Sequence, residues 1–76
     1  MKSINAIKKI ETELEVKVYP VKVGKFATRM AASYKGNFLT FFTTSNGDAE
    51  NFEVSKDLQS NGIFPSNIQE ALKLMR

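Results

Sequence analysis

The sequence of 76 residues contains no cysteine, no histidine and no tryptophan. Without cysteine the chain cannot form a disulfide or offer a thiolate to a metal ion, so burial of apolar side chains, with or without oligomerisation, must stabilise a domain this small. Without histidine it lacks the most common general base near neutral pH, and neither a Ser-His nor a Cys-His dyad can form. We therefore expect no enzymatic activity, no metal site and no cofactor.

Long apolar runs are also absent, since the longest contains three residues, 30–32. A membrane-spanning helix needs about 20 consecutive apolar residues. The N-terminus carries Lys2, Lys8 and Lys9 among isolated isoleucines and lacks the continuous apolar centre of a signal peptide. The absence of cysteine suggests a reducing compartment, so these features predict a cytoplasmic protein. We expect the chain to form one domain over residues 1–76.

The charges are unevenly distributed along a chain whose net charge is +3. Residues 1–35 carry eight Lys/Arg against three Asp/Glu, whereas residues 36–76 carry three against five. A basic half favours contact with nucleic acid or with an acidic protein. The same distribution also fits an ordinary solvated surface, so the charge pattern alone leaves both interpretations open.

Both ends of the chain have the periodicity of amphipathic helices. Apolar residues recur every three or four positions near the N-terminus, with Ser3 as the expected N-cap. Near the C-terminus, Pro65 ends the preceding segment, and Ser66 and Gln69 have the spacing of a capping box. The expected apolar stripes are Ile4, Ile7, Ile10 and Leu14 in the first helix and Ile68, Ala71, Leu72 and Met75 in the second.

Between the helices the period changes to two, which predicts four strands. Pro20 interrupts the first strand, and a bulge near Tyr19 and Pro20 would return the four valines of this region to one face. Gly24-Lys25 marks the following turn. The four valines of the first strand region are Val16, Val18, Val21 and Val23. The inner face of the second strand is expected to carry Phe26, Thr28, Met30, Ala32 and Tyr34.

Two turn signals set the register of the later strands. Asn46-Gly47 is typical of a two-residue type I′ hairpin, which would place Phe41 opposite Phe52 and Leu39 opposite Val54. A two-residue loop at Lys35-Gly36 or at Gly36-Asn37 selects the same inner face. The predicted fold is α+β: a two-layer sandwich in which a four-stranded antiparallel meander carries an N-terminal and a C-terminal helix on one face, in the order α-β-β-β-β-α.

This order of elements is similar to that of the double-stranded-RNA-binding domain. The chain has no histidine-containing loop between strands, and Ser66-Asn67-Ile68-Gln69 stands where that family carries a lysine cluster. The likeness is therefore limited to topology, and no family is assigned from it.

The predicted register turns Phe38 and Phe42 to the outer face of the sheet, away from the helices. We expect a small non-catalytic binding or regulatory module that acts through a protein partner or self-association, of the kind common among phage and plasmid accessory proteins. Its partner-binding residues would be Phe38, Phe42, Arg29 and Lys35. The alternative is nucleic-acid binding through sheet aromatics and the basic half, with Lys8, Lys9, Lys22 and Lys25 contacting phosphates.

The outer face has other interpretations that the sequence leaves open. A single helical turn is expected over residues 57–60, ended by Asn61-Gly62, and the 57–64 loop could fold over the two phenylalanines. One helix could instead cover each face of the sheet. The rings could also be exposed without a function, since scattered apolar side chains are normal on protein surfaces.

Overall fold

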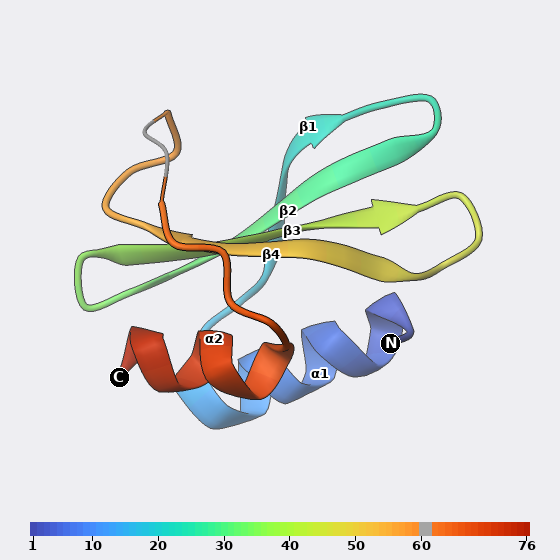
Figure 1. The fold of residues 1–76 in the computed structure, drawn as a ribbon. Helices are drawn as coiled ribbons and strands as arrows, with labels where there is room; N and C mark the ends of the chain where they lie inside the picture. The colour runs from blue at the N-terminus through green and yellow to red at the C-terminus, as the bar shows by residue number, and fades with distance from the viewer. Residues whose placement is uncertain (60–61) are drawn as a thin grey trace.

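The computed structural model describes residues 1–59 and 62–76 and contains a four-stranded antiparallel sheet with a helix at each end of the chain (Figure 1). The sheet has the strand order β1-β2-β3-β4, and both helices lie against the same face of it. The predicted α+β fold is confirmed. The elements are α1 Ser3–Leu14, β1 Tyr19–Val23, β2 Ala27–Tyr34, β3 Asn37–Thr44, β4 Ala49–Ser55 and α2 Ile68–Met75.

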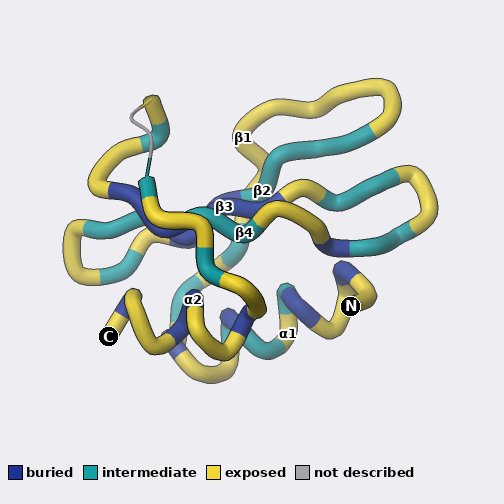
Figure 2. The backbone as a smooth tube through the Cα atoms, viewed as in Figure 1, coloured by how far each residue is buried: buried dark blue, intermediate teal, exposed yellow. Residues whose placement is uncertain are grey.

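The core lies between the sheet and the helix layer, where the buried segments of Figure 2 meet. Leu39 and Phe41 of β3 are fully buried there, as the predicted register requires. The ring centroids of Phe41 and Phe52 lie 5.4 Å apart, so β3 and β4 share an aromatic contact on the inner face. The helices contribute Ala6, Ile10, Leu14, Ile68, Ala71, Leu72 and Met75.

The start of α1 differs from the prediction. Lys2 holds the N-cap position, and Ser3 is the first helical residue rather than the cap. The Ser3 hydroxyl lies 2.5 Å from that of Thr43, and its N–H donates to the carbonyl of Gly47 at 2.8 Å. Both polar groups of Ser3 therefore attach α1 to the β3–β4 hairpin instead of closing the first turn.

This attachment also sets the rotation of α1. The buried residues are Ser3, Ala6, Ile10 and Leu14, while Ile7 is half-buried and Ile4 is exposed. The prediction of Ile4 as a core residue is wrong. The small side chains of Ser3 and Ala6 occupy the buried face of the first turns, where the helix lies close to the hairpin.

The cap of α2 lies one residue later than predicted. The Oδ1 of Asn67 accepts the N–H of Glu70 at 2.9 Å, and the Glu70 carboxylate accepts the N–H of Ser66 at 3.3 Å. The capping pair is therefore Asn67 and Glu70, not Ser66 and Gln69. The predicted stripe of α2 is confirmed, since Ile68, Ala71, Leu72 and Met75 are all buried.

An ion cluster joins the ends of the two helices. The Lys9 ammonium lies 2.9 Å from the Glu13 carboxylate one turn away on α1, and the Arg76 guanidinium at the end of α2 contacts the same carboxylate. Hydrogen bonds from Lys9 and then from Arg76 hold the pKa of Glu13 below its ordinary value of 4.5.

The β1 strand contains the expected bulge, one residue later than predicted. The pairing with β2 shifts between Pro20 and Lys22, which leaves Val21 as the extra residue. Val16 and Val18 precede the strand and pack against the core, but Val23 is exposed. The prediction that all four valines share the inner face is wrong, because the β1–β2 hairpin extends away from the helix layer (Figure 1).

Phe26 is exposed for the same reason. It lies in the loop before β2, which begins at Ala27, so its prediction as an inner-face residue is wrong. The Lys25 ammonium lies 5.7 Å from the centroid of the Phe26 ring, at the tip of the hairpin.

The two predicted turns have different outcomes. Lys35 and Gly36 have φ angles of 50° and 81° between the paired residues Tyr34 and Asn37, which confirms a two-residue loop at Lys35-Gly36. The other turn is a three-residue loop, because the N–H of Gly47 donates to Thr44 and only Gly47 has a positive φ there. The two-residue prediction at Asn46-Gly47 is wrong.

A bulge in β4 compensates for this difference. Near the turn Phe42 pairs with Glu50 rather than with Asn51, and the register then shifts between Thr40 and Phe42. Asn51, with φ of 58°, is the residue that absorbs the shift. Beyond the bulge, the predicted pairings of Leu39 with Val54, Thr40 with Glu53 and Phe38 with Ser55 are confirmed.

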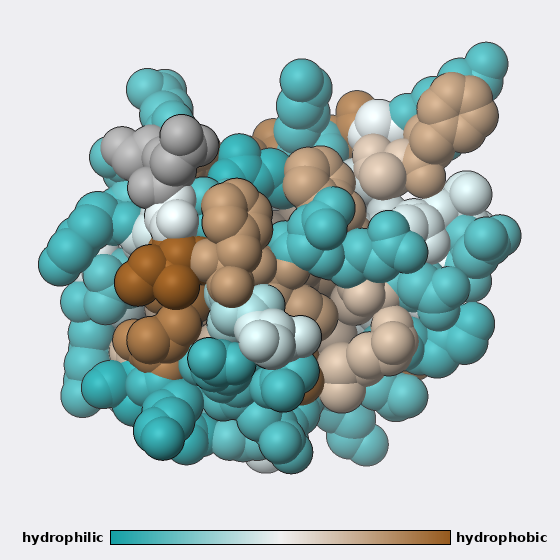
Figure 3. All heavy atoms as spheres, in the orientation of Figure 1, coloured by the Kyte–Doolittle hydropathy of each residue, from teal (hydrophilic) through white to brown (hydrophobic). Residues whose placement is uncertain are grey.

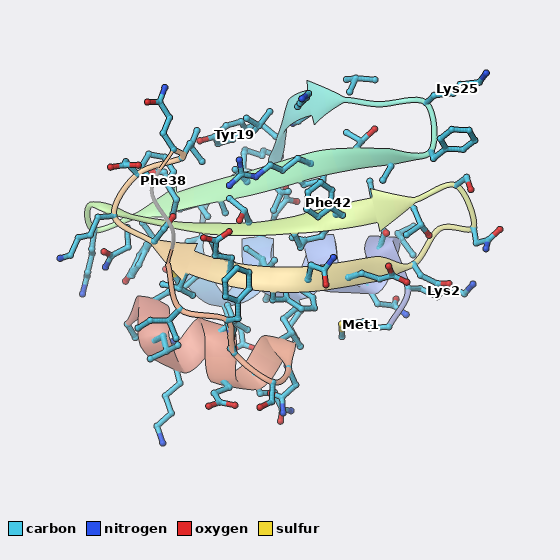
Figure 4. All side chains as sticks on the ribbon, turned by 45° about the horizontal axis from the view of Figure 1, so that its top comes forward. Met1, Lys2, Tyr19, Lys25, Phe38 and Phe42 are labelled. Atoms are coloured by element: carbon cyan, nitrogen blue, oxygen red, sulfur yellow. The ribbon has the colours of Figure 1, made fainter. Side chains whose placement is uncertain are left out.

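The free edge of β4 is covered at both of its ends. The N–H of Ala49 donates to the carbonyl of Met1 at 2.8 Å, and the Lys2 ammonium lies 3.4 Å from the Asp48 carboxylate (Figure 4). At the other end, Val54 and Ile63 exchange two backbone hydrogen bonds of 2.8 and 2.9 Å. Pairing of this kind protects an edge strand from other chains.

Candidate functional site

The outer face of the sheet carries the two phenylalanines of the sequence prediction (Figure 4). Phe42 pairs with Arg29 of β2 and Glu50 of β4, and it is 37% exposed. Phe38 pairs with Ser33 and is only half-buried, in contrast to the fully buried Leu39 and Phe41 of the same strand.

The segment after β4 covers part of this face. Arg29 Nη1 donates to the carbonyl of Leu58 at 3.1 Å, and its Nη2 lies 3.9 Å from Glu53 Oε1. The other Glu53 oxygen accepts the N–H of Gly62 at 2.7 Å. Arg29 and Glu53 thus bind the chain at Leu58 and at Gly62. In Figure 1 the chain after β4 rises on the side of the sheet opposite the helices.

Two residues of the outer face, Ala31 and Thr40, are buried. The segment after β4 contacts this face through Arg29 and Glu53, whereas Phe42 stays partly exposed, so the alternative in which the 57–64 loop folds over both phenylalanines is not confirmed. Residues 57–59 form bends rather than a helical turn, and the rest of the predicted turn, residues 60 and 61, lies outside the described residues.

Replacing Glu53 with alanine is expected to lower the free energy of unfolding by about 1–2 kcal/mol, because the Gly62 N–H loses its acceptor and Arg29 loses its nearest carboxylate. Urea unfolding followed by circular dichroism measures the change. The control is Glu50→Ala, on the same strand but exposed. Equal midpoints for the two variants would contradict this role of Glu53.

The four predicted partner-binding residues do not form one exposed patch. Arg29 is engaged with the chain's own Leu58 carbonyl, and its side chain is 24% exposed. Lys35 lies in the β2–β3 turn, where its ammonium is 5.3 Å from the centroid of the Tyr34 ring. Phe42 and Lys35 are both exposed but belong to different places, β3 and the β2–β3 turn, so the set as a partner site stays a prediction.

The four predicted phosphate-binding lysines lie in two separate places. Lys8 and Lys9 are on α1, in the helix layer, and the Lys9 ammonium is paired with Glu13. Lys22 lies on β1 and Lys25 in the turn that follows it, within the β1–β2 hairpin that extends away from the helix layer (Figure 1). Lys22 of β1 pairs with Arg29 of β2, a pairing that the sequence analysis did not predict.

A second surface, which sequence reasoning missed, lies beside β4 and α2. Ile63, Phe64 and Leu74 are 59%, 66% and 40% exposed, and Figure 3 shows apolar atoms gathered in this region. Ile63 and Leu74 line one hollow of about 470 Å³. We call Ile63, Phe64 and Leu74 the apolar surface. The other residues that line the hollow are Asn37, Val54, Ser55, Lys56 and Gly62.

Two signals in the sequence point to the apolar surface. Leu74 does not belong to the buried stripe of α2, so a helix packed on that stripe must expose it. The apolar pair Ile63-Phe64 stands directly before Pro65, outside any predicted element. What the sequence does not reveal is the pairing of Ile63 with Val54, which brings this pair beside α2.

Within residues 1–59 and 62–76, no group of three or more Asp, Glu, His or Cys side chains converges in a way that could hold a metal ion. None of the helices in this described part of the chain has the length and apolar character needed to span a membrane. Comparison of the chain with protein-family models, curated proteins and solved structures gave no match.

Proposed function

We propose that this protein is a non-catalytic binding or regulatory module of the cytoplasm that acts by contacting another protein. The observation that carries the proposal is the apolar surface of Ile63, Phe64 and Leu74, next to a hollow of about 470 Å³. Large exposed apolar side chains that gather in one place are typical of interaction sites, whereas single ones are not. The absence of histidine and cysteine supports a role without catalysis.

The apolar surface is held in place by backbone contacts. Ile63 is fixed to β4 by its two hydrogen bonds with Val54, and the preceding N–H of Gly62 is bound by Glu53. Pro65 restricts the chain that follows Phe64. A surface that is already ordered loses less conformational entropy when a partner binds, which favours its use as a recognition site.

The size and charge of the surface indicate the kind of partner. A stable protein interface buries about 800 Å² on each side, which three partly exposed side chains cannot supply. The hollow of about 470 Å³ instead suits a short segment of another protein that carries an apolar anchor. Lys56 is the charged residue of its lining and is exposed, so acidic residues beside that anchor would be favoured.

Selection from a random peptide library displayed on phage, followed by affinity measurement of the selected peptides, tests this proposal. We expect peptides with an apolar anchor flanked by acidic residues. Leu74→Lys should weaken their binding at least tenfold. Gln69→Lys adds the same charge at another exposed position of α2 and should change affinity less than twofold.

Two results would overturn the proposal. One is the absence of any selected peptide that binds with a dissociation constant below about 1 mM. The other is equal affinity of the selected peptides for the wild type and Leu74→Lys. Light scattering provides a third check, because a stable dimer that Leu74→Lys dissociates would make a second copy of the chain the occupant of this surface.

A further inference from the structure

Four directly paired residues form a row across the outer face, one from each strand. Lys22 of β1 pairs with Arg29 of β2, Arg29 with Phe42 of β3, and Phe42 with Glu50 of β4. Lys22, Arg29 and Phe42 also line one pocket of about 310 Å³, together with Gly24 and Ala27. Two cations and an aromatic ring therefore face a common space at the β1–β3 side of the sheet.

The charge of this side is of one sign. Residues 16–47, which include all of β1, β2 and β3, carry five Lys/Arg and no Asp/Glu. In the described part of the chain, no carboxylate lies within 4 Å of the Lys22 or Lys25 ammonium. Glu50 and Glu53 belong to β4, the strand farthest from β1, where Glu50 pairs with Phe42 and the Glu53 carboxylate lies 3.9 Å from Arg29.

Arg29 is held in a fixed position but keeps donors for a ligand. It donates one hydrogen bond to Leu58, and its 3.9 Å separation from Glu53 exceeds hydrogen-bonding distance. A guanidinium group has five N–H donors. Among the described residues, most of these donors therefore remain free for an anion near Phe42.

The aromatic rings indicate which polyanion fits. Phe42 and Tyr19 are each 37% exposed, and Tyr19 pairs with Ala31 in the row next to Arg29. Exposed rings on a sheet stack on unpaired bases, whereas the bases of a duplex are already stacked on one another. Phe42 lies two strands from Lys22, about 10 Å at the usual strand spacing, a separation that allows one ligand to contact both.

We propose that the outer face between β1 and β3 binds single-stranded nucleic acid. Phe42 stacks on a base, with Tyr19 as a second ring, while Lys22, Lys25 and Arg29 contact the backbone phosphates. Glu50, which pairs with Phe42 from the β4 side, repels phosphates there and directs the backbone of the strand toward Lys22 and Lys25. Lys8 and Lys9, on the helix layer, take no part. This site shares no residue with the apolar surface, so either proposal can fail without the other.

Fluorescence anisotropy with labelled 12-residue oligonucleotides tests this proposal. We expect micromolar binding of oligo(dT) and oligo(rU) at 50 mM salt. The logarithm of the affinity should fall with the logarithm of the salt concentration with a slope of about −2, as for three phosphate contacts on a single strand. Unmeasurable binding of both oligonucleotides at 50 mM salt would overturn the proposal.

Three variants test the assigned residues. Lys22→Gln should reduce the magnitude of the salt slope by about 0.7, while the matched control Lys8→Gln leaves it unchanged. Phe42→Leu keeps an apolar side chain but removes the ring, and it should weaken binding about tenfold. An equal effect of Lys8→Gln and Lys22→Gln, or an unchanged affinity of Phe42→Leu, would overturn the assignment.

Two other ligands separate this site from a general anion surface. A duplex of the same length and a poly-glutamate peptide should each bind at least tenfold more weakly than oligo(dT). Binding of either with similar affinity, insensitive to Phe42→Leu, would overturn the proposal of a single-stranded ligand.

Discussion

Replacing Phe41 with alanine is expected to lower the free energy of unfolding by about 3–5 kcal/mol, while Phe42→Ala lowers it by about 1 kcal/mol or less. Phe41 is fully buried between the sheet and the helices and contacts the Phe52 ring, whereas Phe42 is 37% exposed on the opposite face. Because a domain this small has a total stability of several kcal/mol, the Phe41 variant should be largely unfolded at 37 °C.

Thermal and urea unfolding of the two variants measure this contrast. The pair is matched in side chain, in strand and in substitution, so differences of backbone propensity cancel. Equal destabilisation by the two substitutions would contradict the assignment of the faces of β3, and with it the exposure of Phe42 on which the nucleic-acid proposal depends.

Gly62→Ala is expected to lower the free energy of unfolding by about 2–3 kcal/mol, or to detach the segment that contains Ile63. A Cβ atom at this position would overlap the carbonyl oxygen of Val54 and would lie 2.7 Å from the Cβ of Ser55. Both neighbours belong to a paired region of β4 and cannot move without breaking the hydrogen bonds between Val54 and Ile63.

Gly47→Ala is the control for this substitution. Gly47 has a positive φ of 82° but open space around its Cα atom, so alanine there should cost only about 1 kcal/mol of backbone strain. Urea unfolding gives the stabilities, and hydrogen exchange at the Ile63 amide detects local detachment. A Gly62→Ala variant that is as stable as Gly47→Ala and retains protection at Ile63 would contradict the close approach.

The architecture and the inner face of the sheet were predictable because several local patterns agree. Alternation in β3 and the loop at Lys35-Gly36 both direct Leu39 and Phe41 inward. The register beyond Thr40 was correct although the turn at Asn46-Gly47 was not, because the bulge at Asn51 offsets the extra loop residue. Both loop types place a positive φ at Gly47, so the sequence does not distinguish them.

The features that the sequence did not predict depend on contacts between distant residues. The rotation of α1 follows from the contact of Ser3 with Thr43, forty positions away. The cover over the outer face depends on Arg29 reaching Leu58, and the apolar surface depends on Ile63 pairing with Val54. The sequence prediction correctly selected Phe42 as an exposed ring and grouped Arg29 with it, but it did not place Lys22 beside them.

We propose that this protein contacts its partner through the apolar surface beside β4 and α2. The most direct test is to record amide ¹H–¹⁵N spectra while a library-selected peptide is added to the intact chain. We expect shifts concentrated at Val54, Gly62, Ile63 and Leu74, with the amides of Lys22, Arg29 and Phe42 unchanged. Shifts centred on the outer sheet face, with Ile63 and Leu74 unaffected, would contradict it.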